Sequence, residues 1–224
     1  MELKVLFEDN HVVVVYKPQD LEFLELTELV RSHIATKKQN ESVYVQALYA
    51  LDKCMGGVAV FCLTSKAMDR CTNQLKDNNC EFDFFAVCLS NEKVGTGGYS
   101  EYAEYVTDTT MRRVPELNKN ANNITFNYRK VDQIKEISLY KVTAQNVLRN
   151  AIRFGLADMG TPVFGDTDYN GDKLAKGTHV ALCLVDFSFE HPITKDRLRF
   201  RCLPPIESKP WSYFDMEKIL RVAR

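Results

Sequence analysis

Short apolar runs of strand length, separated by turn residues, constrain the fold of this chain more than any other feature. β-branched and aromatic residues at this length favour strands. None of these runs approaches the ~20 residues needed to cross a membrane. The runs fall at residues 4–7, 12–16, 58–63, 82–89, 124–130, 136–142, 180–189 and 197–202.

Helical spacing of apolar residues is confined to a few segments. It predicts helices over residues 21–34, 65–76 and 146–159, with Ser65 as an N-cap, and a last helix over 212–222. Residues 91–123, rich in Gly, Thr and Asn, are expected to form loops around one short strand.

The helices and strands show no regular βαβ alternation. This predicts an α+β fold with a mixed or antiparallel central sheet flanked by helices and loops. Without a repeat or a clear linker, residues 1–224 are expected to form one domain.

The charge balance limits the classes of partner. Lys and Arg total 29 and Asp and Glu total 30, so the net charge is −1. Nucleic-acid binders often carry positive excess, so any RNA contact must come from a local basic surface. The seven cysteines form no Cys-x-x-Cys pair, which argues against zinc and for free thiols in a reducing cytoplasm. The N-terminus lacks a signal-peptide pattern.

Two sets of residues are candidates for chemistry. Leu51-Asp52-Lys53 precedes Gly56-Gly57 and a buried strand, so Asp52 could face a cleft at a sheet edge. The alternative is a turn or cap residue. Arg149 and Arg153 are four residues apart and would share one helix face, although that face could simply be solvated.

Two further patterns lie on predicted strands. Lys195, Arg197, Arg199 and Arg201 occupy alternate positions, and none of these four positions is acidic. They could neutralise RNA phosphates, or form the wet face of an antiparallel sheet. In the segment 82–85, the Phe84 ring packs in the core or stacks on a base.

Taken in order, these segments resemble the RluA family of RNA pseudouridine synthases. Residues 5–18, ending in Lys-Pro, look like the family's opening "vlyeDnhllvvnKP". Residues 49–57 (Tyr-Ala-Leu-Asp-Lys-Cys-Met-Gly-Gly) occupy the place of H-R-L-D-x-x-T-S-G. Residues 82–87 fit K-x-Y-x-A, and 137–142 look like S-L-L-E-V.

The resemblance continues to residue 205. Residues 148–153 (Leu-Arg-Asn-Ala-Ile-Arg) take the place of R-T-H-Q-I-R, and 160–166 (Gly-Thr-Pro-Val-Phe-Gly-Asp) are similar to "GhPllGD". Residues 189–192 and 198–204 are similar to the family's F-x-H-P and L-x-F-x-a-P-L-P ending. Seven motifs in order cover most of the chain, so the extra N-terminal RNA-binding domain that many relatives carry is not expected.

The resemblance implies an activity and the residues that carry it. Asp52 would be the catalytic carboxylate that isomerises uridine to pseudouridine in ribosomal or transfer RNA, without a metal or organic cofactor. Arg153 would pair with Asp52 and keep it ionised, and the uridine would flip out of its stack. Substrate contacts are expected from Leu51, Lys53, Phe84, Arg149 and Ile152.

The chain also departs from the family pattern. Ala50 replaces an arginine associated with filling the gap left by the flipped nucleotide, and Tyr49 replaces a histidine. Phe84 keeps a stacking face but lacks the hydroxyl of the family's tyrosine. These changes leave an alternative open, namely a catalytically inactive RNA-binding or ribosome-assembly factor, with a ribosomal particle as partner. An unrelated hydrolase with Asp52 as base lacks a second acid or histidine in support.

Overall fold

A single mixed sheet runs through the molecule. The computed structural model describes residues 2–145, 148–170 and 179–222. Within these residues, nine strands follow the order β1-β2-β4-β10-β5-β9-β8-β6-β7, while β3 pairs with β4 and β11 pairs with β10. The strands are β1 (Val5–Glu8), β2 (Val12–Lys17), β3 (Gln46–Ala47), β4 (Gly56–Cys62), β5 (Glu81–Leu89), β6 (Thr96–Tyr105), β7 (Met111–Arg113), β8 (Asn122–Ile134), β9 (Ile137–Ala144), β10 (Leu182–Glu190) and β11 (Arg197–Arg201).

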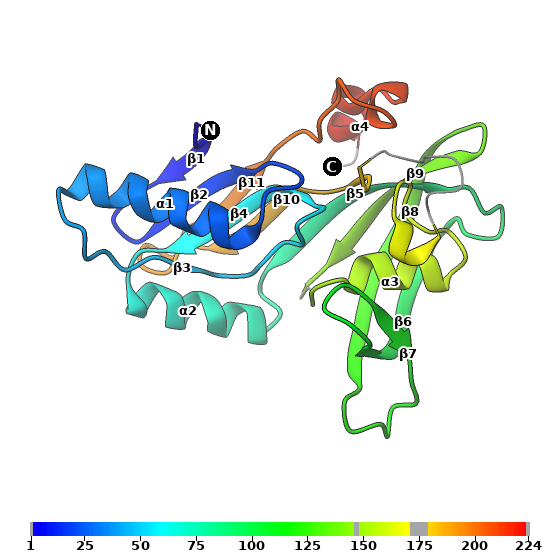
Figure 1. Ribbon diagram of the computed structural model, residues 1–224, viewed down its shortest axis with the longest axis horizontal. Helices are drawn as coiled ribbons and strands as arrows, with labels where there is room; N and C mark the ends of the chain where they lie inside the picture. The colour runs from blue at the N-terminus through cyan, green and yellow to red at the C-terminus, as the bar shows by residue number, and fades with distance from the viewer. Residues whose placement is uncertain (1, 146–147, 171–178, 223–224) are drawn as a thin grey trace.

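Four α-helices accompany the sheet (Figure 1). They are α1 (Phe23–Lys38), α2 (Ser65–Lys76), α3 (Ala151–Asp158) and α4 (Met216–Val222), with 3-10 turns at Thr167–Tyr169 and Trp211–Tyr213. In Figure 1, α1 and α2 lie with β1–β4, and α3 lies with β6–β8 at the other end. The predicted α+β fold with a mixed sheet is confirmed. β4 and β10 pair in parallel, and the other strand pairs are antiparallel.

The apolar runs are continuous because the central strands are covered on both faces. Val13 and Val15 of β2 pack against α1 through Leu26 and Val30. The intervening Val12 and Val14 belong to the main core on the opposite face, so all four valines of the run are buried.

The Gly-rich segment after β5 is more ordered than its composition predicts. The region expected to be mostly loop contains β6, which pairs with β8 over residues 96–103, and the short strand β7. These backbone hydrogen bonds come from partners distant in sequence, and such pairing outweighs the weak strand preference of Gly and Asn.

Two helix starts differ from the prediction. The cap of α2 is Thr64, whose hydroxyl accepts from the Ala67 N–H at 3.1 Å, rather than Ser65. Helix α3 begins only at Ala151, since Asn150 adopts a left-handed conformation with φ of 63°. Residues 146 and 147 of the predicted helix lie outside the described residues. The prediction that Arg149 and Arg153 share a helix face is therefore wrong, because Arg149 precedes the helix.

Gly56 and Gly57 begin β4 and do not form the expected turn. Gly57 has φ of +136°, and a Cβ there would lie 2.4 Å from the Leu184 carbonyl oxygen. The close parallel approach of β4 and β10 thus requires a glycine. Asp52 consequently lies just before the start of a central strand, not at the lateral edge of the sheet.

Across the described ranges, none of the helices is long and apolar enough to span a membrane.

Candidate active site

The Asp52 carboxylate is buried and has specific partners. Its side chain is 5% exposed. Oδ1 accepts a hydrogen bond from Arg149 Nε at 3.2 Å, and Oδ2 accepts one from the Asn150 backbone N–H at 3.2 Å. Burial raises the pKa of the carboxyl; the charge of Arg153, the Asn150 N–H and Arg149 oppose this rise, and the net shift is upward.

Arg149 lies over the carboxylate at the surface. Its side chain is half exposed, and its carbonyl oxygen accepts from the Tyr105 hydroxyl at 3.0 Å. The neighbouring Asn150 Nδ2 donates to the Asp108 carbonyl at 2.9 Å. The turn between β6 and β7 therefore holds the segment that covers Asp52.

Arg153 does not form the expected direct pair with Asp52. Its guanidinium binds Asp166 through two bonds, Nε to Oδ2 at 2.7 Å and Nη2 to Oδ1 at 2.6 Å. Further bonds reach Asp168 and the Asn150 side chain. Among the described residues, the arginine in direct contact with Asp52 is Arg149. The pairing prediction is wrong because the carboxylate of Asp166 takes the planar fork of Arg153, which acts on Asp52 only through its charge.

Lys17 is a site residue that the sequence analysis missed. It is fully buried, and Nζ donates to the carbonyl oxygens of Pro18 at 3.1 Å, Lys53 at 3.0 Å and Met55 at 2.6 Å. Two of these carbonyls belong to the loop that directly follows Asp52. Lys17 thus fixes that loop to the end of β2. Its position in a Lys-Pro motif was visible, but nothing in the sequence gives its acceptors.

The connection after β2 adds further bonds to the same loop. The Asp20 N–H donates to the Lys53 carbonyl at 2.9 Å, and Gln19 Nε2 donates to the Cys54 carbonyl at 3.0 Å. The backbone turn is closed by the Met55 N–H bonded to the Asp52 carbonyl at 3.0 Å. Asp52 is therefore held from both sides, by residues 17–20 and by residues 149–150.

The pocket at Asp52 is narrow in this conformation. Its free volume is about 10 Å³, room for at most one water molecule. Leu51 and Ile152, both predicted to contact substrate, line it together with Arg149. A uracil enters only if part of this lining moves. Arg149 lines the pocket, contacts Asp52 directly and has a half-exposed side chain.

Two other predicted substrate contacts lie elsewhere. Lys53 points to the surface and forms an ion pair with Glu22 at 2.8 Å. Phe84 has no exposed surface and packs nearly parallel to Phe82, with ring centroids 6.4 Å apart. Phe84 is absent from the lining of the Asp52 pocket, so its stacking on a base stays a prediction that requires the pocket to open.

The predicted basic patch is largely neutralised. Arg197, Arg199 and Arg201 do share one exposed face of β11. However, Arg199 Nε lies 2.8 Å from Asp186, and Arg201 Nε lies 2.5 Å from the same carboxylate. None of the four positions is acidic, as noted from the sequence, but the neighbouring strand β10 supplies Asp186, which offsets the charges of Arg199 and Arg201.

The two remaining members of the patch are also engaged. Lys195 has φ of 69° and so lies in the turn before β11, where it pairs with Glu190 at 2.9 Å. Arg197 donates to the Asn79 carbonyl at 2.7 Å and to the Ser188 hydroxyl at 2.9 Å. A phosphate at this face would therefore compete with existing partners for all four cations.

Comparisons with known proteins find similar sequences and similar folds. No protein-family model matches the chain. In sequence it is similar to ribosomal large subunit pseudouridine synthase D of Vibrio cholerae, at 23% identity over 92% of this chain and 68% of that protein. It is also similar to the dual-specificity RNA pseudouridine synthase RluA of Haemophilus ducreyi, at 22% identity over 90% and 93% of the two chains.

Solved structures show the same fold. Human RNA pseudouridylate synthase domain containing 4 matches with a TM-score of 0.74 and 15% identity over 97% of this chain and 93% of that one. Human RNA pseudouridylate synthase domain containing 1 matches with a TM-score of 0.73 and 12% identity, over 99% and 94%. The chain thus has the pseudouridine synthase fold. Within that class, the resemblance to the RluA family seen in the motifs is confirmed by its sequence relatives.

Proposed function

We propose that this protein isomerises uridine to pseudouridine in RNA, with Asp52 as the catalytic carboxylate. The observation that carries the proposal is the placement of Asp52, a buried acid held by two bonds at the base of a pocket in a pseudouridine synthase fold. The RNA pseudouridine synthases among its sequence relatives support the same reaction.

The reaction has three steps. The bond between C1′ of the ribose and N1 of uracil breaks, the base rotates, and a bond forms between C1′ and C5. N1 takes up a proton, and C5 releases its proton to solvent. Asp52 serves as nucleophile or promotes base detachment. The Arg153 charge and the Asn150 N–H favour the ionised carboxylate against the effect of burial. Arg149 must leave its position over Asp52 for the base to enter.

Lys17 and Arg153 act as positioning residues in this proposal. Lys17 holds the loop that follows Asp52, and Arg153 joins α3 to Asp166. Neither group needs to touch the substrate. Both fix the carboxylate relative to the pocket, which matters because a small misplacement of a catalytic group costs much of its effect.

A second candidate function is RNA binding without catalysis. It is favoured by the closed pocket of about 10 Å³ and by Ala50 on its rim, where the family pattern has an arginine. In this alternative the protein holds RNA or a ribosomal precursor as an assembly factor, and Arg149 stays bound to Asp52.

Tritium release separates the two functions. Ribosomal and transfer RNAs transcribed with uridine tritiated at C5 are incubated with the parent protein, Asp52→Asn and the exposed control Asp69→Asn. Isomerisation releases tritium with the parent and Asp69→Asn and none with Asp52→Asn. No release by any of them, together with a clear electrophoretic shift of the RNA, supports the binding function instead.

The substrate and location stay proposals as well. A structured ribosomal or transfer RNA, a ribosomal particle as additional partner and a cytoplasmic location are all consistent with the named relatives. β11 alone is not expected to bind the RNA, because its arginines already have partners.

A further inference from the structure

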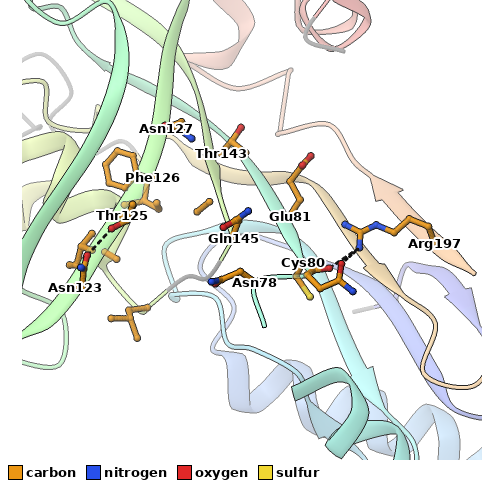
Figure 2. Close-up of a pocket in the computed structure, with 16 residues that line it drawn as sticks. Asn78, Cys80, Glu81, Asn123, Thr125, Phe126, Asn127, Thr143, Gln145 and Arg197 are labelled. Atoms are coloured by element: carbon orange, nitrogen blue, oxygen red, sulfur yellow. Dashed lines mark hydrogen bonds between the residues drawn. The ribbon is translucent and has the colours of Figure 1, made fainter. Parts of the chain in front are cut away.

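A large cleft adjoins the Asp52 pocket (Figure 2). Its volume is about 840 Å³, within the range of small-molecule sites, about 300–1,000 Å³. Leu148, Ala151 and Ile152 line both the cleft and the pocket. A chain bound with one residue at Asp52 would therefore place its neighbouring residues in this cleft.

The walls of the cleft carry amides and hydroxyls. Asn123, Thr125 and Asn127 are exposed at alternate positions of β8, so they share one face about 7 Å apart along the strand. Asn78 lies on the opposite wall, and Gln145 lies between the two walls in Figure 2. We call these five side chains the amide cleft.

The cleft has almost no free charge. Its lining contains two charged residues, Glu81 and Arg197, which are of opposite sign. Arg197 already donates to the Asn79 carbonyl at 2.7 Å. Binding of RNA phosphates depends on Lys and Arg, so this surface is poorly suited to follow a phosphate backbone.

Three of the amides have unused hydrogen-bonding capacity. The side chains of Asn78, Asn127 and Gln145 form no hydrogen bond with other groups in the described ranges, and all three are exposed. A carboxamide offers both a donor and an acceptor. Nucleobase edges present the same mixture, and Asn or Gln can pair with a base through two bonds. Bases of single-stranded RNA are read in this way on their exposed edges.

We propose that the amide cleft binds the edges of unpaired nucleobases beside the target uridine and so sets the sequence selectivity of the protein. The proposal rests on the function proposed above, since it places the uridine at Asp52. It assigns base reading to Asn127 and Gln145 in particular. Asn127 lies on β8, Gln145 directly follows the adjacent strand β9, and both amides are unpaired among the described residues. Affinity gained this way depends on base identity and little on salt.

Selection from a random RNA pool tests the proposal without knowledge of the natural substrate. The probe is a hairpin library with a ten-nucleotide loop, a fixed central uridine and random flanking bases. It is bound to full-length protein carrying Asp52→Asn, which separates binding from catalysis. The same background then carries Asn127→Ala with Gln145→Ala, or the control Asn73→Ala, an exposed amide of α2 outside the cleft.

The expected result is a base preference at one or more loop positions beside the uridine. Asn73→Ala keeps that preference, and the double variant loses it, with about a tenfold loss of affinity for the selected RNA, as expected for one two-bond amide–base contact. The salt dependence of binding is the same in all variants.

Two results overturn the proposal. One is the absence of any base preference in the RNA selected by the Asp52→Asn protein. The other is a base preference that survives when Asn127→Ala and Gln145→Ala are added. The tritium-release assay is read separately on the parent protein. If the parent releases tritium but the base preference does not depend on the amide cleft, the proposed function is kept and this inference is rejected. If the base preference depends on the amide cleft but the parent releases no tritium, catalysis is rejected and base reading is kept.

Discussion

Replacement of Lys17 by methionine tests how the Asp52 loop is held. Methionine has a similar length and no donor. The substitution removes three hydrogen bonds from a buried ammonium group. The Lys53 carbonyl keeps its bond from the Asp20 N–H, so the Pro18 and Met55 carbonyls are the ones that lose a partner.

The magnitude follows from those two carbonyls. A buried polar group left without a partner costs about 1–3 kcal/mol. Relief from burying the ammonium offsets part of this cost. We therefore expect Lys17→Met to lower the free energy of unfolding by about 2–4 kcal/mol, which corresponds to a shift of about 1 M or more in the urea midpoint.

The pH dependence gives an independent signature. Burial lowers the pKa of the Lys17 ammonium to about 8, against an ordinary value of 10.5. Between these values the unfolded chain binds more protons than the folded one, so the contribution of Lys17 to stability increases as the pH rises through this window. The difference in unfolding free energy between parent and Lys17→Met should therefore widen from pH 8 to pH 10.5.

The assay is urea unfolding followed by circular dichroism, with Lys53→Met as matched control. Lys53 is an exposed lysine of the same loop with one surface ion pair, worth at most about 1 kcal/mol. A loss below about 1 kcal/mol in Lys17→Met, equal to that of the control, or a gap that stays constant above pH 8, would refute the reasoning.

Four further outcomes are expected. Asp52→Asn should be more stable than the parent near pH 7, because the raised pKa of this buried acid means that its ionised form destabilises the fold. In urea unfolding, the difference in unfolding free energy between the two proteins should narrow as the pH falls toward 3.8. The isomerisation rate of the parent should decline at acidic pH with an apparent pKa above 3.8, and Arg149→Gln should move it upward in single-turnover assays. Arg153→Met should cost about 3–5 kcal/mol in urea unfolding by leaving Asp166 buried without its partner. Gly57→Ala should cost at least about 2 kcal/mol by thermal or urea unfolding, whereas Gly95→Ala, with open space around its Cβ, should change little.

The sheet was predictable because its signal is local. The run 58–63 is apolar at every position, and β4 is buried on both faces between β2 and β10. Hairpin β1–β2 follows from two short runs and a polar turn. Only the end of β6 was predicted, as a short strand near residues 101–106, because its full length comes from pairing with β8, which no local pattern encodes.

The site was predictable only in part, for the same reason. Asp52 was identified from its motif, but its direct arginine was assigned to Arg153 because spacing does not reveal that Asp166 binds that guanidinium. The basic face of β11 was correctly placed on one side of a strand. Its neutralisation depends on Asp186 of β10, which becomes a neighbour of the β11 arginines only when β10 and β11 pair.

Several departures from the family pattern lie in one place. Ala50, Met55 and Asn150 line the narrow pocket at Asp52, whereas Tyr49 and Phe84 do not. Lys17 and Asp166, which match the pattern, also lie outside its lining. The matching residues hold the loop and helix that fix the carboxylate. We expect the changed residues of this lining to alter which RNA the pocket admits and how it opens, whereas the loop that follows Asp52 is held by Lys17, which matches the pattern.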